Sequence, residues 1–371
     1  MWGTRMFVLV ALVALLTLSV AAADTTVAAD GSAVDRTPVI LIADPGIDDA
    51  AALLLAASSP LFELVGVVSS FGCHSDVART SANARRVLRY AGRRDVPVCV
   101  GPAKPLGALA PLGDADGRIV HGDDALGDVG DDEHGGGDAE GGAPCPGDVS
   151  GVEFLVAQAR ARPGELTLVA TGPLTALALA LQLEPRLPAL VAGARAMGGA
   201  LARAGNVSPL AEANFAHDAL AARLVVASFG RALALYPLDV THAASFTPAR
   251  REALRRSGGG GRVAARFFAD AVALYQRRYA EVAGFVDGGA PLHDAHPIAA
   301  LMAPALYEHA ETRLAVVVAR PGDVAHGAVV VDRRPKPSQV GADGEATVLV
   351  ARAVDADGFL ELVVSGLAAI P

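Results

Sequence analysis

Cysteine and basic charge are both scarce in this 371-residue chain, and each scarcity excludes a class of protein. Three cysteines, Cys73, Cys99 and Cys145, are too few and too scattered for a disulfide scaffold or a thiolate zinc site. The 31 Lys and Arg residues are outnumbered by 40 Asp and Glu, which argues against a protein that binds nucleic acid through its charge. Because the chain is 52% hydrophobic, a disordered protein is excluded, and the length suffices for one large core or two ordinary ones.

Long apolar runs are also lacking, except at the N-terminus. After Ala23, Arg, Asp or Pro interrupts every apolar stretch before it is long enough to span a membrane. Arg5 precedes a nearly unbroken apolar run at residues 7–20, and the run leads into three alanines that end at Ala23. This is the pattern of a secretory signal peptide cleaved after Ala23. The alternative is an uncleaved anchor helix over residues 6–23, which just reaches the length needed to cross a bilayer.

Cleavage predicts a mature protein outside the cytosol, in the extracellular space or a vacuolar lumen. We expect no stable membrane contact unless the signal segment stays uncleaved. Residues 24–37 are small and polar and are interpreted as a linker. An oxidising compartment allows one disulfide among the three cysteines, but the sequence leaves open which two would pair.

From residue 38 onward, short apolar or β-branched runs alternate with Ala- and Leu-rich helical segments. Strands are predicted at residues 39–42, 64–69, 96–100, 166–170, 190–197 and 232–237. Helices are predicted at residues 49–57, 78–91, 152–162, 174–183 and 216–228. Apolar strands separated by helices indicate an α/β fold, with a mainly parallel sheet flanked by helices on both faces. We predict one domain over residues 38–371, with a β-rich end from Leu314 onward.

Two stretches break this alternation. Residues 128–151 are rich in glycine and acids and contain the run DDEH at residues 131–134. This run has the composition of a metal-binding tract, but we interpret the whole stretch as a solvated insertion loop. Residues 257–261 are a serine and four glycines before a predicted helix that carries Tyr275 and Tyr279. Such a flexible piece is a lid in many enzymes and by default only a loop.

The most informative motif, ADPGIDDA at residues 43–50, follows the first predicted strand and opens the first helix. Ligands bind at the carboxyl ends of the strands in a parallel α/β sheet. Capping explains one aspartate at a helix start, but Asp44, Asp48 and Asp49 exceed what a cap requires. Close carboxylates repel one another unless a cation lies between them, and oxygen ligands of this type suit Ca²⁺ or Mg²⁺.

A rival interpretation of this motif is a phosphatase of the haloacid dehalogenase class. Those enzymes also carry two aspartates at a strand end, and the nucleophile lies two residues before the second one. Here that position is Ile42, which cannot form a phosphoaspartate, so this class is excluded.

Further motif-like blocks follow along the chain. They are SANAR at residues 81–85, VHGDDALG at 120–127, ATGPLTA at 170–176, MGG at 197–199, GNVSPLAEANFAHD at 205–218, LDVTH at 238–242, PLHDAHP at 291–297 and GAVVVD at 327–332. Residues 42–49 match D-x-D-P-G-x-D-D in all but its first aspartate. In this order, the blocks resemble the inosine-uridine preferring nucleoside hydrolase family from residue 39 nearly to the C-terminus.

The resemblance implies an enzyme that hydrolyses the N-glycosidic bond of purine or pyrimidine ribonucleosides, giving ribose and free base around a bound Ca²⁺. Carried over by position, Asp44, Asp49 and Asp294 would be carboxylate ligands, and Thr171 would offer its backbone carbonyl. Asp44, beside a bound water, would also act as the general base.

The transition state of this reaction resembles a ribosyl cation, so the sugar must be held by its hydroxyls. The resemblance assigns this task to residues whose side chains suit vicinal diols: Asp48, Asn206, Glu212 and Asn214, with Cys73 nearby. His293 would assist the departure of the base, and His121 would line the same pocket. For Tyr275 and Tyr279, closure over the base and simple packing both remain open.

Three positions depart from the family pattern. Ile42 replaces the first aspartate of the motif, Cys73 stands where the family has asparagine, and Ala213 replaces a bulky residue. The set of metal ligands survives, so we expect metal binding, but losing one oriented polar group can lower a rate by orders of magnitude. Two alternatives to the hydrolase therefore remain: a non-catalytic nucleoside- or ribose-binding homologue, and a hydrolase of a modified riboside.

Asn206 also opens the glycosylation sequon N-V-S in a chain that we expect to be secreted. A ribose ligand must lie inside the pocket, where a glycan does not fit, and we favour the ligand role. The sequence does not set the base preference. The resemblance implies a homo-oligomer, either a dimer or a tetramer.

Overall fold

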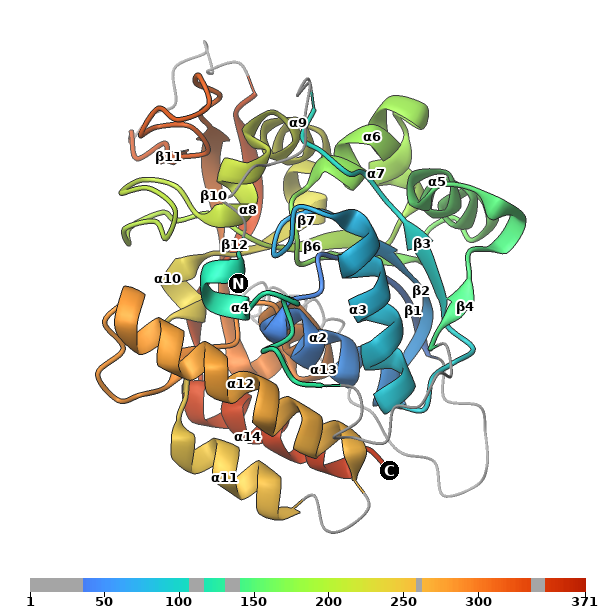
Figure 1. The fold of residues 1–371 in the computed structure, drawn as a ribbon. Helices are drawn as coiled ribbons and strands as arrows, with labels where there is room; N and C mark the ends of the chain where they lie inside the picture. The colour runs from blue at the N-terminus through green and yellow to red at the C-terminus, as the bar shows by residue number, and fades with distance from the viewer. Residues whose placement is uncertain (1–35, 107–116, 131–140, 258–261, 335–343) are drawn as a thin grey trace, which may run out of the picture. The chain divides into compact units, whose positions relative to one another are not determined.

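The computed structural model describes residues 36–106, 117–130, 141–257, 262–334 and 344–371 (Figure 1). The folded unit runs from Thr37 to Pro371. The predicted signal segment and nearly all of the predicted linker lie outside the described residues. Within the part of the chain that is described, no helix combines the length and the apolar character needed to cross a membrane.

A ten-stranded sheet forms the centre of this unit. Its strands, in sheet order, are β11 (Val329–Val331), β10 (Tyr307–Val316), β12 (Ala346–Val354), β7 (Leu233–Tyr236), β6 (Gly193–Met197), β5 (Thr167–Ala170), β1 (Thr37–Ala43), β2 (Phe62–Ser69), β3 (Pro97–Val100) and β4 (Ala143–Pro144). Neighbours from β12 to β4 run parallel, whereas β10 is antiparallel to both β11 and β12. A separate antiparallel pair joins β8 (Ser245–Phe246) and β9 (Ala290–Pro291). The predicted mainly parallel α/β sheet is confirmed.

Helices cover both faces of the sheet (Figure 1). One face carries α2 (Ile47–Ser58), α3 (Val77–Tyr90), α11 (Pro248–Ser257), α12 (Val263–Val282), α13 (Ala295–Met302) and α14 (Ala356–Ala369). The other carries α5 (Gly151–Ala161), α6 (Thr175–Leu183) and α9 (Ala219–Phe229). Shorter helices are α4 (Arg118–His121), α7 (Leu187–Leu190), α8 (Ala213–His217), α10 (Leu238–Thr241), η2 (Pro146–Asp148), η3 (Gly230–Ala232) and η5 (Pro304–Leu306).

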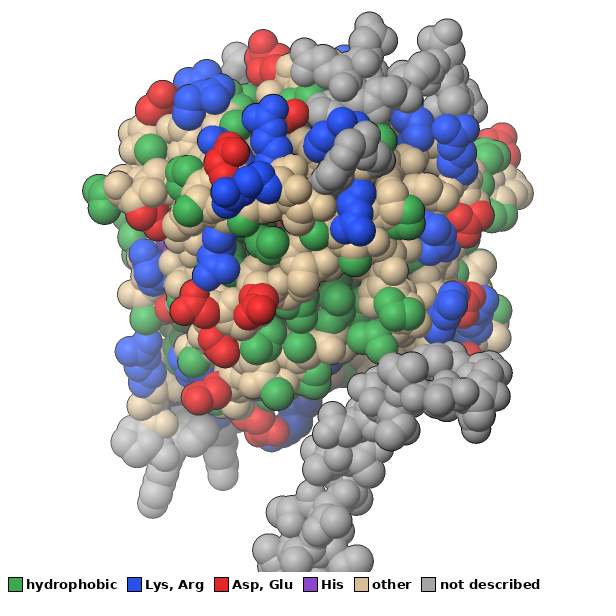
Figure 2. Space-filling view, turned by 90° about the horizontal axis from the view of Figure 1, so that it is seen from below, with side chains coloured by type: hydrophobic (Ala, Val, Ile, Leu, Met, Phe, Trp, Pro, Cys, Tyr) green, Lys and Arg blue, Asp and Glu red, His purple; other side chains and the backbone are tan. Residues whose placement is uncertain are grey.

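The two apolar cores follow from the alternation of side chains along the strands. In β1, Leu41 and Ala43 join the core under α2, whereas Ile40 and Ile42 join the core under α5 and α6. All four are fully buried, as expected for a parallel strand with helices on both faces. On the outer face shown in Figure 2, basic, acidic and apolar side chains are interspersed.

The chain departs from the predicted elements at three places. The predicted strand 190–197 begins only at Gly193, because residues up to Leu190 form α7. The predicted helix 216–228 is broken at Asp218, whose non-helical backbone ends α8 and whose side chain caps Ala221 N in α9. The predicted β-rich end contains β10, β11 and β12 but closes with α14, which buries Phe359 and Val363.

A disulfide joins Cys99, in β3, to Cys145, just after β4. It settles the pairing that the sequence left open, with Cys73 as the free thiol. Within the predicted insertion loop 128–151, Ala143 and Pro144 belong to the sheet as β4, whereas residues 146–150 are exposed. The run DDEH and the glycines at 258–261 lie outside the described residues.

Candidate active site

The carboxyl ends of the central strands open into a cavity of about 890 Å³. Of the residues that the sequence assigned to the site, all but Asp49 line this cavity, and they come from segments spread over most of the chain. They are Asp44, Asp48, Cys73, His121, Thr171, Asn206, Glu212, Asn214, His293 and Asp294. Asp49 lies fully buried directly behind them.

A cluster of carboxylates forms the floor of the cavity. Asp44 follows β1, Asp48 and Asp49 lie in the first turn of α2, and Asp294 precedes α13. One carboxylate oxygen from each of Asp48, Asp49 and Asp294 lies within 4.8 Å of the other two. All four side chains are at most 5% exposed.

Hydrogen bonds from neighbouring groups fix the orientations of two of these carboxylates, Asp49 and Asp44. Asp49 accepts hydrogen bonds from Gly46 N (3.1 Å) and from the Thr171 hydroxyl (2.7 Å). Asp44 accepts one from Cys73 N at 2.6 Å. Glycines allow the chain to pass this close, because a Cβ at Gly72 or Gly172 would lie 2.0 or 2.4 Å from an Asp44 oxygen.

The buried carboxylates of the cluster repel one another when they are ionised, and a bound cation would relieve this repulsion. Burial raises the pKa of Asp44 and Asp294 well above the usual range, and the adjacent carboxylates raise it further. The same causes raise the pKa of Asp48 to about 7, and burial also raises the pKa of Asp49. Asp48 Oδ1 is buried and has no hydrogen-bond partner among the described residues. An all-oxygen set of this kind fits a divalent cation.

Polar groups of the 197–214 segment form the wall beside this floor. Glu212 caps α8 and accepts hydrogen bonds from the backbone N–H groups of Asn214, Phe215 and Gly199 at 2.8, 3.2 and 2.9 Å. The Asn214 amide donates to the carbonyl of Thr171 at 2.7 Å, the carbonyl that the resemblance assigns to the metal. Asn206 lies at the rim, where it is exposed and accepts a hydrogen bond from Ala213 N.

A buried histidine, His293, lines the cavity beside Asp294. His293 Nδ1 lies 2.7 Å from the Thr241 hydroxyl, and Nε2 lies 2.8 Å from the Tyr279 hydroxyl. Burial, followed by the nearby histidines His242 and His296, holds the pKa of His293 well below its usual range. The imidazole is therefore neutral, so one of its nitrogens donates to one of these hydroxyls and the other nitrogen accepts from the other hydroxyl.

His121 connects the floor to Cys73. Ile47 N donates to His121 Nδ1 at 3.1 Å, so the proton of the neutral ring is on Nε2, which lies 3.4 Å from Cys73 Sγ. Nδ1 therefore cannot also act as a charged partner for Asp48, 4.0 Å away. Burial, together with the carboxylates, raises the pKa of Cys73 well above its usual range, so its side chain is a thiol.

The two other departures from the family pattern, Ile42 and Ala213, differ in location: the first lies in the apolar core and the second lines the cavity. The Ile42 side chain is fully buried in the apolar core, and its carbonyl accepts a hydrogen bond from Thr171 N at 2.8 Å. Ala213 is part of the cavity wall between Glu212 and Asn214. The Ile42 side chain therefore belongs to the apolar core and not to the carboxylate cluster.

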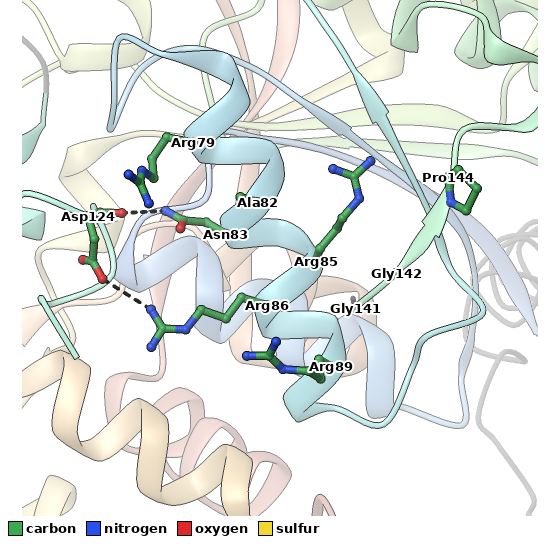
Figure 3. Close-up of a pocket in the computed structure, with 10 residues that line it drawn as sticks. All are labelled: Arg79, Ala82, Asn83, Arg85, Arg86, Arg89, Asp124, Gly141, Gly142 and Pro144. Atoms are coloured by element: carbon green, nitrogen blue, oxygen red, sulfur yellow. Dashed lines mark hydrogen bonds and ion pairs between the residues drawn. The ribbon is translucent and has the colours of Figure 1, made fainter. Parts of the chain in front are cut away.

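Residues without an assigned role also shape the site. Asn83, in α3, donates from Nδ2 to the carbonyls of Pro45 (3.1 Å) and Asp124 (2.8 Å). It ties the Asp44 loop to the loop after His121, and Figure 3 shows it beside the Arg86–Asp124 ion pair. The motif SANAR marked this helix but gave no role to its asparagine.

These features define an α/β enzyme with a buried carboxylate site at the strand ends. Residues 39–361 match the family model described as inosine-uridine preferring nucleoside hydrolase, and the chain belongs to this family of N-glycosyl hydrolases. It is 34% identical to a probable uridine nucleosidase 2 of Arabidopsis thaliana, over 90% of this chain and 98% of that protein. It is 35% identical to the pyrimidine-specific ribonucleoside hydrolase RihA of a Shewanella species, over 89% of this chain and 96% of that protein.

Solved structures give the same result. A plant nucleoside hydrolase, the PpNRh1 enzyme, superposes with a TM-score of 0.78 at 27% identity, over 90% of this chain and 99% of that one. A purine-preferring ribonucleoside hydrolase from Gardnerella vaginalis gives a TM-score of 0.77 at 26% identity, over 90% of this chain and 98% of that one. The predicted fold and family are confirmed, and the roles of individual site residues stay predictions.

Proposed function

We propose that the protein hydrolyses the N-glycosidic bond of ribonucleosides to ribose and free base, and that it requires Ca²⁺. The observation that carries this proposal is a single cavity lined by four buried carboxylates and two buried histidines. They are Asp44, Asp48, Glu212, Asp294, His121 and His293. The carboxylates suit the sugar and a cation, and His293 suits the leaving base. The relatives are named for uridine, pyrimidine ribonucleosides or purine ribonucleosides, and these names support ribonucleosides as the substrate class.

The floor of the cavity would hold the ribose and the attacking water. The calcium ion would be held by Asp44, Asp49, Asp294 and the carbonyl of Thr171. When bound, it would act as a Lewis acid that lowers the pKa of water and polarises the ribose oxygens. Asp48, Glu212 and Asn214 would bind the sugar hydroxyls. Hydrogen bonds already fix the orientations of Glu212 and Asn214, and the buried Asp48 Oδ1 has no hydrogen-bond partner among the described residues. Asp44 would accept the proton of the water as its oxygen bonds to C1′ of the ribose.

The part of the cavity lined by His293 and Tyr279 would receive the leaving group. As the bond from C1′ to the base nitrogen breaks, its electron pair stays on the base, which then requires a hydrogen bond or a proton. His293 and Tyr279, joined at 2.8 Å, would supply it. The low pKa of His293 favours a neutral donor over a permanent cation.

Ribose release from five nucleosides tests this function. The purified protein is incubated with inosine, adenosine, guanosine, uridine or cytidine, with Ca²⁺ or with EDTA, and reducing sugar is measured. We expect release that depends on Ca²⁺. If nucleosides bind in calorimetry but no ribose is released, the protein is a binding homologue. If they neither bind nor react, the substrate is another riboside.

Calcium should stabilise the fold more at high pH than at low pH. In the metal-free protein, the folded-state pKa values of the four aspartates lie above the unfolded value of about 4, so folding retains protons that the unfolded chain releases. Stability without the ion therefore falls as the pH rises from about 4 toward 7 and above. Calorimetry at pH 5 and pH 8 should show a larger rise of Tm with Ca²⁺ at pH 8, and an equal or smaller rise there would contradict the cation site.

We also propose that the protein acts outside the cytosol as a homo-oligomer. The Cys99–Cys145 disulfide supports an oxidising compartment, because such bonds rarely persist in the cytosol. Light scattering coupled to gel filtration measures the oligomeric state, and a monomer at micromolar concentration would contradict the expected dimer or tetramer.

A further inference from the structure

The substrate cavity contains a polar atom that the reaction does not use. His242 follows α10 and lines the cavity, and its Nε2 is buried without a hydrogen-bond partner among the described residues. Its ring centroid lies 5.1 Å from that of His293 and 5.4 Å from that of Phe285. An unpaired nitrogen at this place is costly unless a bound molecule supplies the missing partner.

The helix α10 organises this end of the cavity. Its Thr241 contacts His293, and its Asp239 accepts hydrogen bonds from the backbone N–H groups of residues 201 and 202 at 2.8 Å and of Arg203 at 3.2 Å. This carboxylate fixes the loop that carries Arg203 into the cavity wall. The Arg203 charge also acts on His242, where burial and that charge hold the imidazole pKa at about 4.

We propose that Arg203 and His242 recognise the edge of the base and select nucleosides whose base presents an oxo group there. This inference rests on the proposed function, because it places the base beside His293. A guanidinium only donates hydrogen bonds, so Arg203 pairs with the carbonyl oxygen of uracil or hypoxanthine and is mismatched with the amino group of cytosine or adenine. Neutral His242 supplies an acceptor or a donor for the neighbouring ring nitrogen, according to its tautomer.

Five proteins separate base recognition from a structural role: the unaltered protein, Arg203→Met, His242→Phe, His242→Gln and Arg231→Met. Methionine keeps the apolar stem of arginine without its donors. Arg231 pairs with Glu311 on the surface and is the matched control. Uridine, cytidine and p-nitrophenyl β-D-ribofuranoside are compared by kcat/KM. The last substrate has the same sugar but lacks the base edge and needs no help in leaving.

We expect Arg203→Met and His242→Phe to lower kcat/KM for uridine by about tenfold to a hundredfold. The p-nitrophenyl riboside should change less than about threefold, and the uridine preference over cytidine should shrink in Arg203→Met. The Arg231→Met control should match the unaltered protein. His242→Gln, which retains a hydrogen-bonding side chain, should recover part of the uridine activity lost in His242→Phe.

Several outcomes would overturn the inference. Equal losses on all three substrates would indicate that the residues only support the fold, and unchanged ratios would show that they do not touch the base. If the unaltered protein hydrolyses none of the three, the proposed function fails instead. Calorimetric binding of uridine and cytidine to the unaltered protein and to Arg203→Met then decides base recognition, and equal selectivity in the two proteins would exclude it.

Discussion

Replacing Asp44 with asparagine should lower kcat on ribonucleosides by about 10³-fold or more, while the protein remains folded. Asparagine has the same shape and can still accept the hydrogen bond from Cys73 N, which the carboxylate accepts at 2.6 Å. It cannot take the proton of the attacking water, and it binds a cation more weakly. A positioned general base contributes about 10² to 10⁴ in rate, and the weakened metal site adds to that loss.

The measurement is the initial rate of ribose release at saturating nucleoside and Ca²⁺, with Tm recorded for each protein. Asp95→Asn is the matched control, because Asp95 is an exposed partner of Arg93 away from the cavity. It should leave the rate unchanged. A loss of less than about tenfold in Asp44→Asn would remove Asp44 from the role of base.

Replacing His293 with alanine should separate substrates according to how much help their leaving group needs. Nucleoside hydrolysis should fall by about 10² to 10⁴, because a departing base without a hydrogen bond carries an unstabilised negative charge. The p-nitrophenyl riboside should keep most of its rate, since p-nitrophenolate leaves readily as an anion. Tyr279→Phe should show a smaller loss in the same direction, because it removes the hydroxyl 2.8 Å from His293 Nε2.

The kinetic constants for uridine and for the p-nitrophenyl riboside, measured on both variants, decide this point. His326→Ala serves as the control, since His326 contacts the carbonyl of Ala319 and does not line the cavity. Equal losses on both substrates would mean that His293 holds the site together and does not assist the leaving group.

The N-terminal half of the fold and the position of the site were predictable from sequence. Strand β1 is apolar and buried from Val39 to Ala43 because helices cover both of its faces. The motif ADPGIDDA begins at the end of this strand, where parallel sheets bind ligands. These are local signals, since each depends on residues that are neighbours in the chain. They were sufficient to predict a cation site at Asp44, Asp48 and Asp49.

Local signals failed where distant contacts decide the structure. Asp218 breaks the predicted helix because its carboxylate, besides capping Ala221 N, accepts hydrogen bonds from Thr175 Oγ1 and Leu106 N, far away in the chain. Helix α14 was not predicted, because its apolar side chains are buried only when the helix packs against α2, which is far away in the sequence. No pattern near either segment contains that information.

The sequence by itself determined the family, the order of strands and helices in the core, and which residues are chemically suited to bind a cation and a sugar. Only the tertiary structure brought a carboxylate oxygen of Asp294 to within 4.8 Å of those of Asp48 and Asp49, paired Cys99 with Cys145, and placed His242 and Arg203 in the lining of one cavity. The physical reason is that motif chemistry depends on residue type and spacing, whereas these contacts depend on how the sheet and its helices pack residues from distant parts of the chain.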